Sequence, residues 1–188
     1  GAVEVSDFLD LPVIPSARRE FIAGLLVYIQ NMDIKHLAEI NLYNLLDSSP
    51  TLTALRDIST GWQVDVEKLQ HSPYIPLPGD WDIYLSGIDK KQRHEIRRKM
   101  RRATEADVPV RWYLAADGSA LDSEIDGFLE LMKQDGDKDE FLRPAMQDFV
   151  RRVAHSAFDA GILHLAFLEV DGRKAAAYLS FDYDNRVW

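Results

Sequence analysis

Positive charge is concentrated in one short stretch of this sequence, "KKQRHEIRRKMRR", which runs from Lys90 to Arg102. Eight of its thirteen residues are Lys or Arg and only Glu95 opposes them, so the stretch carries a net charge of +7. The whole chain of 188 residues carries −9, and the remainder therefore sums to −16. Because a guanidinium forms two parallel hydrogen bonds to a phosphate, this stretch has the chemistry of an anion-binding site.

The spacing of these basic residues predicts a helix with one charged face. Ile88, Ile96, Met100 and Ala103 are expected to face the core. The basic residues expected to point outward are Lys90, Arg93, Arg97, Arg98 and Arg101, and the candidates for binding substrate or phosphate are Lys91, Arg93, Arg97, Arg98 and Arg101. Residues 93, 97 and 101 repeat every four positions, so their side chains should line one ridge. That ridge is either a solvated face, neutralised by the acidic remainder of the fold, or a site for phosphate or another polyanion.

The other reactive residue types form no recognisable site. The sequence contains no cysteine, which excludes disulfides, thiolate zinc sites and a cysteine nucleophile. The five histidines, at 36, 71, 94, 155 and 164, lack metal-ligand spacing, and His94-Glu95 is not within an HExxH pattern. The acidic stretch 135–140 resembles a calcium loop but lacks the glycine that such loops have at their sixth position, and the twelfth position is Met146 rather than glutamate. We therefore expect no metal.

Composition suits one medium domain or two small ones in a reducing, cytoplasmic setting. Hydrophobic residues make up 46% of the chain, which is enough to build a core. No apolar run approaches the roughly 20 residues that a membrane-spanning helix needs, so we expect no membrane span.

The elements that must position the basic stretch divide into two groups. Residues 1–70 predict the order helix, strand, helix, strand: a helix after Pro15, a strand at 34–42, a helix capped by Ser49, and an alternating strand at 62–69. Three prolines and a glycine mark 71–80 as a linker.

After the linker, the sequence predicts a short helix at 81–88 and the basic helix to about residue 106. A strand at 108–116, helices at 121–134 and 144–160, and a hairpin turning at Asp171-Gly172 follow. A last strand begins at residue 186. This order predicts an α/β protein whose sheet is mainly antiparallel, with sheet fragments on both sides of the linker.

Three stretches together resemble the GNAT-like acyltransferases of the FemAB/CelD branch, in which two GNAT-type modules sit in tandem. They are "SPTLTAL" (49–55), "PLPGDWDIYLSGIDKKQRHEIRRKMRR" (76–102), and "DKDEFLRPAMQDFV" followed by "LEVDGRKAAAYLSF". In that branch a helix of the form K-x-R-x-x-x-R-R-x-x-R-R opens the second module. The residues that fit this form are Lys91, Arg93, Arg97, Arg98, Arg101 and Arg102.

The resemblance implies that residues 1–70 are the back of a first module and residues 81–188 the front of a second. It also implies acetyl-CoA or another acyl-CoA as cofactor. The family's Q/R-x-x-G-x-G/A phosphate-binding signature is absent from this sequence. We therefore expect a fragment of a longer enzyme that binds acetyl-CoA weakly by itself.

Two functions are expected from the resemblance and the charge. The first is transfer of an acyl group from a thioester, or from aminoacyl-tRNA, to the amine or hydroxyl of a small or anionic acceptor. No catalytic base is identified, and Glu169 and Asp182 are either candidates or ordinary solvent-facing carboxylates. The alternative is a non-catalytic domain that binds nucleic acid or another polyanion through residues 90–102.

Overall fold

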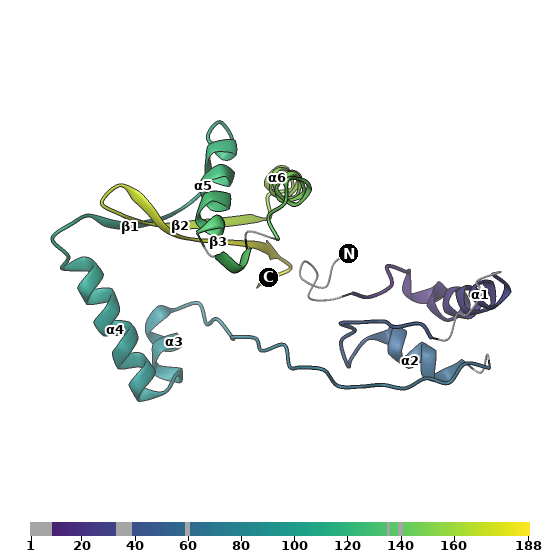
Figure 1. The fold of residues 1–188 in the computed structure, drawn as a ribbon. Coiled ribbons are helices and arrows are strands. Elements are labelled where there is room, and N and C mark those ends of the chain that lie inside the picture. The colour runs from purple at the N-terminus through teal and green to yellow at the C-terminus, as the bar shows by residue number, and fades with distance from the viewer. Residues whose placement is uncertain (1–8, 33–38, 59–60, 135, 139–140) are drawn as a thin grey trace. The chain divides into compact units, whose positions relative to one another are not determined.

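The chain divides into two compact units, Gly1–Tyr74 and Ile75–Trp188. The division falls inside the proline-rich stretch 71–80. The computed structural model describes residues 9–32, 39–58, 61–134, 136–138 and 141–188, and Figure 1 draws the elements along the chain.

The regular elements in the described residues of the first unit are all helices. A single 3₁₀ turn, η1 (Pro15–Ala17), leads into α1 (Arg18–Asn31), and α2 (Pro50–Asp57) follows. Ser49 caps α2 as predicted, because its hydroxyl accepts the Thr51 N–H at 3.0 Å. The Asp10 carboxylate accepts from the hydroxyls of both Ser49, at 2.7 Å, and Thr51, which satisfies two buried polar side chains.

The prediction of a strand at 62–69 is wrong. Residues 61–74 form neither helix nor strand, although their apolar residues alternate as in a strand. A strand needs a hydrogen-bonded neighbour, and the described residues of this unit provide none. Of the strand predicted at 34–42, residues 34–38 lie outside the described residues and residues 39–42 form no strand.

All strands of the described residues belong to the second unit. Its elements are α3 (Trp81–Gly87), α4 (Lys90–Thr104), β1 (Val110–Leu114), α5 (Leu121–Lys133), η2 (Gly136–Lys138), α6 (Pro144–Asp159), β2 (Leu163–Val170), β3 (Arg173–Tyr183) and β4 (Arg186–Val187). Each predicted helix and strand of this half is present, with ends shifted by a few residues. The strands form one antiparallel sheet in the order β1-β2-β3-β4, which confirms the predicted α/β class with an antiparallel sheet.

The β2–β3 hairpin turns where the sequence predicts it. Asp171 and Gly172 have φ values of 53° and 72°, and two successive positive values are what a tight two-residue hairpin turn requires. A bulge between Leu168 and Glu169 shifts the pairing, so that Glu169 lies opposite Lys174. This register decides which charged side chains meet on the sheet.

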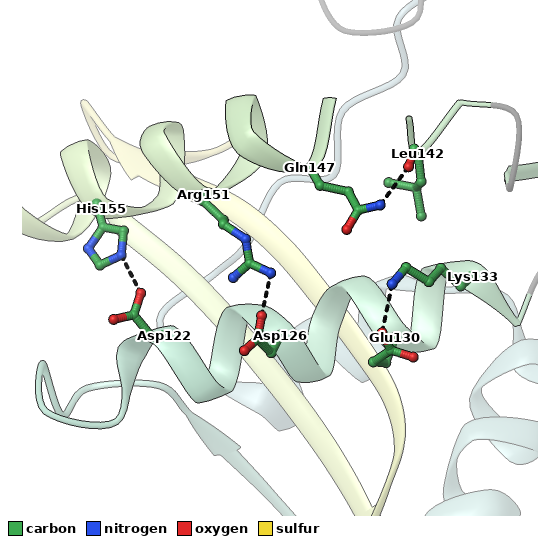
Figure 2. Close-up of polar contacts among 8 residues, drawn as sticks. All are labelled: Asp122, Asp126, Glu130, Lys133, Leu142, Gln147, Arg151 and His155. Atoms are coloured by element: carbon green, nitrogen blue, oxygen red, sulfur yellow. Dashed lines mark hydrogen bonds and ion pairs between the residues drawn. The ribbon is translucent and has the colours of Figure 1, made fainter. Parts of the chain in front are cut away.

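Helices α5 and α6 cover one face of the sheet (Figure 1). The buried core between them consists of Leu121, Ile125, Leu129, Leu142, Ala154, Leu165 and Phe167. Polar contacts at the surface also join the two helices (Figure 2): Arg151 pairs with Asp126, and His155 Nε2 lies 2.8 Å from Asp122 Oδ1. No helix in the described part of the chain is long and apolar enough to cross a membrane.

Candidate functional site

Helix α4 carries the basic stretch, and it is almost entirely exposed. Asp89 caps its N-terminus by accepting the N–H groups of Lys91, at 2.7 Å, and Gln92, at 3.4 Å. No residue of α4 is buried, and Met100 on the expected core side is 50% exposed. The predicted core-facing side is thus largely uncovered by the described residues: Ile88 and Ile96 are half-buried, while Met100 and Ala103 are exposed.

Arg93 has a structural partner at the junction with α3. Its guanidinium donates to the carbonyl oxygens of Leu85, at 3.1 Å, and Ser86, at 3.2 Å. These carbonyls belong to the last turn of α3, where helices lack internal donors. Arg93 therefore caps α3, and part of the predicted ridge serves the fold.

Arg98 is paired within α4. Its Nε and Nη2 atoms donate to the two carboxylate oxygens of Glu95 at 2.9 and 2.7 Å, and Lys99 lies 3.7 Å from the same carboxylate. The hydrogen bonds from Arg98 hold the pKa of Glu95 below its usual range. Both cations are partly neutralised by Glu95.

The remaining predicted site residues keep their charge exposed. Arg97 lies 3.9 Å from Asp82, a distance at the outer limit of an ion pair. The side chains of Lys91 and Arg101 make no hydrogen bond or ion pair with the described residues, and both are exposed. Of the predicted site residues, these three are the ones whose charge is left for a ligand.

Four exposed residues of α4 define a face that shares Arg97 and Arg101 with the predicted ridge but does not include Arg93. Lys90, His94, Arg97 and Arg101 stand at intervals of four, three and four residues, which is one side of an α-helix. This row, the basic face of α4, extends over about 16 Å at the rise of an α-helix. Sequence periodicity located the helix but could not separate this face from Arg93.

The two carboxylates considered as bases lie in different environments. Glu169 on β2 is 9% exposed, and Arg111 on β1 donates from Nε to its Oε2 at 2.6 Å. The hydrogen bond from Arg111 lowers the pKa of Glu169, which makes it a weak base at neutral pH. Asp182 on β3 is exposed, and its carboxylate makes no hydrogen bond or ion pair with the described residues.

A polar network beside Glu169 was not predicted from the sequence. Lys174 on β3 lies 2.8 Å from Glu124 Oε2 on α5, and its Nζ is 4.4 Å from the ring centroid of Phe167. The Tyr113 hydroxyl donates to Glu124 at 3.0 Å, and burial together with Glu124 raises the pKa of Tyr113 to about 12. The network joins β1, β2, β3 and α5, with each charge next to an opposite one.

Gly127 on α5 makes room for this network. A Cβ atom at that position would lie 2.5 Å from Lys174 Nζ and 2.9 Å from its Cδ. A side chain at residue 127 would therefore displace Lys174 from its present position along α5. Glycine lowers the stability of a helix by roughly 1 kcal/mol relative to alanine. The close approach of Lys174 to α5 gives a reason for glycine at this position despite that loss.

Acid should destabilise the second unit through Glu169. Since its pKa is lower in the folded protein than in the unfolded chain, its contribution to stability is complete above the unfolded value near 4.5 and is lost as the pH falls through the folded value. We expect the urea concentration at the unfolding midpoint to decrease as the pH is lowered below 4.5. This decrease should be less steep in Glu169→Gln. Asp182→Asn is the matched control and should follow the wild type. Equal slopes for Glu169→Gln and the wild type would contradict this assignment.

The histidines and acidic residues of the described ranges provide no metal site. No group of three or more His, Asp or Glu side chains there is arranged to hold a metal ion. His36 and residues 135, 139 and 140 of the acidic loop lie outside the described residues.

The second unit also matches a known protein family. Residues 90–188 match the family model of the acetyltransferase (GNAT) domain, and the match begins at the first residue of α4. No curated protein and no solved structure matches the chain significantly. The matched range is just over half of the 188 residues, and it contains the basic helix, the network and the whole sheet. This chain therefore belongs to the GNAT acetyltransferase family.

Proposed function

We propose that this chain is part of an enzyme that transfers an acyl group from acyl-CoA to an amine or hydroxyl, and that the basic face of α4 binds an anionic group of the donor or the acceptor. Acyl transfer is the chemistry of GNAT domains, which generally use acetyl-CoA. The observation that carries the proposal is that the family match begins on α4, so the basic helix belongs to the domain. The tandem FemAB-like arrangement is a further part of the proposal.

The exposed cations of α4 fit the phosphate groups of such a ligand. Arg97 and Arg101 are one helical turn apart, and each offers a planar pair of donors to phosphate oxygens. Lys91 lies beside this face and adds a third exposed charge near the start of the helix. A bound acyl-CoA would supply the activated thioester, while these residues would bind and orient a phosphate-bearing partner.

Two arginines on the same helix should separate binding from folding. Arg101→Ala should weaken binding of CoA or another phosphate-rich ligand by roughly 1–3 kcal/mol and leave the melting temperature unchanged. Arg93→Ala should instead destabilise the fold by about 1 kcal/mol, because the carbonyls of Leu85 and Ser86 lose their donor. Titration calorimetry and thermal melts measure both. Arg101→Lys should restore part of the affinity, since lysine keeps the charge but not the planar fork.

Unchanged affinity in Arg101→Ala would contradict the binding role of α4. Acyl transfer itself is tested by incubating the chain with labelled acetyl-CoA and a panel of amines and alcohols. Ligand binding without transfer to any acceptor would favour the second candidate, a non-catalytic domain that binds polyanions through residues 90–102. That candidate is supported by the absence of an unpaired buried base among the described residues of the second unit.

A further inference from the structure

Large apolar side chains are exposed just before the basic helix. Ile75, Leu77, Trp81 and Ile83 are 65%, 70%, 50% and 60% exposed, although they fall within nine residues of the second unit. Trp81 stacks on Tyr84 with ring centroids 5.4 Å apart, which holds its ring in place. Exposed apolar residues in such density are typical of an interaction surface.

These apolar residues directly precede the basic stretch 90–102, where the positive charge of the chain is densest. Arg93 binds the carbonyls of Leu85 and Ser86, and Arg97 lies near Asp82, so α3 and α4 form one hairpin. The residues 90–102 of that hairpin carry +7 while the rest of the chain carries −16. This asymmetry would turn the hairpin, and not the acidic remainder, toward a negatively charged surface.

We propose that residues 75–104, which include the α3–α4 hairpin, dock on the surface of an anionic lipid bilayer. Clusters of four to eight Lys or Arg on a helix attract acidic lipid headgroups, and nearby aliphatic and Trp side chains enter the headgroup boundary. The segment contains both features: eight basic residues on α4, and the exposed apolar residues Ile75, Leu77, Trp81, Ile83 and the half-exposed Met100.

A bilayer suits this surface better than a nucleic acid does. Nucleic acid would pair with the cations, but its backbone offers no apolar environment for Ile75, Leu77 and Ile83. Single-strand binding uses aromatic stacking platforms, whereas most of these exposed residues are aliphatic. The proposal does not depend on acyl transfer, because docking needs neither an acyl donor nor an acceptor.

Co-sedimentation of the full chain with vesicles tests the proposal. We expect binding to phosphatidylcholine vesicles that contain 30% phosphatidylserine and none to pure phosphatidylcholine. Leu77→Ser should weaken binding about tenfold, because the variant loses the leucine side chain that would move from water into the bilayer. Arg101→Ala should weaken it about fivefold. Matched controls are Tyr178→Ser, which alters an equally exposed side chain on β3, and Arg152→Ala on α6, and both should bind as the wild type does.

Each alternative outcome overturns the proposal in a recognisable way. Equal binding to both vesicle types would mean that charge plays no part. Weaker vesicle binding by Arg101→Ala but not by Leu77→Ser would mean that the surface binds through charge alone. Tighter binding to a single-stranded oligonucleotide than to the acidic vesicles would mean that the ligand is nucleic acid. Vesicle binding that fails while CoA binding and acyl transfer persist would reject the docking surface and leave the proposed function intact.

Discussion

Replacing Phe167 by alanine is expected to lower the free energy of unfolding of the second unit by about 3–5 kcal/mol. Phe167 is 2% exposed, lies in the core beneath α5, and stacks on Tyr113 with ring centroids 5.5 Å apart. Its ring also faces the ammonium group of Lys174 at 4.4 Å, so the substitution removes packing and a cation–π contact together.

Urea denaturation followed by circular dichroism measures this effect. Leu168→Ala is the matched control: Leu168 follows Phe167 on β2 but points to the other face, where it is 39% exposed. We expect the control to cost less than half as much as Phe167→Ala, because less apolar surface leaves a buried environment. If Phe167→Ala prevents folding, Phe167→Leu should give a smaller measurable loss. Equal costs for Phe167→Ala and Leu168→Ala would show that the core is not centred on Phe167.

Replacing Lys174 by methionine should destabilise the second unit by about 2–3 kcal/mol. Lys174 and Glu124 have side chains that are only 24% and 16% exposed, so removing the cation leaves a largely buried carboxylate with Tyr113 as its remaining donor. The expected loss is set below that of a fully buried pair because solvent reaches both groups.

A double-mutant cycle separates the pair from the cost of the orphaned charge. Lys174→Met combined with Glu124→Leu should recover part of the stability that Lys174→Met loses, since neither charge is then buried alone. Lys133→Met is the control, because Lys133 pairs with the exposed Glu130 at 2.7 Å and should change the stability by no more than about 0.5 kcal/mol. Additive losses in the double variant would contradict a direct coupling.

Local signals in the sequence determined the helices and the hairpin. Ser49 and Pro50 start α2 through a hydroxyl cap and a preset backbone angle, and Asp171-Gly172 supplies the positive φ values of the turn. Each of these signals acts between residues close in the chain, so sequence alone predicted them. The basic charge of α4 was equally visible, since it depends on composition and helical periodicity.

Only the tertiary structure decided which side chains meet. The alternating residues 62–69 form no strand because a strand is completed by a neighbour, which the local pattern cannot supply. Arg93 left the predicted ridge because the carbonyls of α3 need a donor. Glu169 is bound by Arg111, a residue 58 positions away, through a strand register that no local pattern specifies. Sequence determines what is encoded between near neighbours, while charge pairing and burial depend on contacts between distant segments.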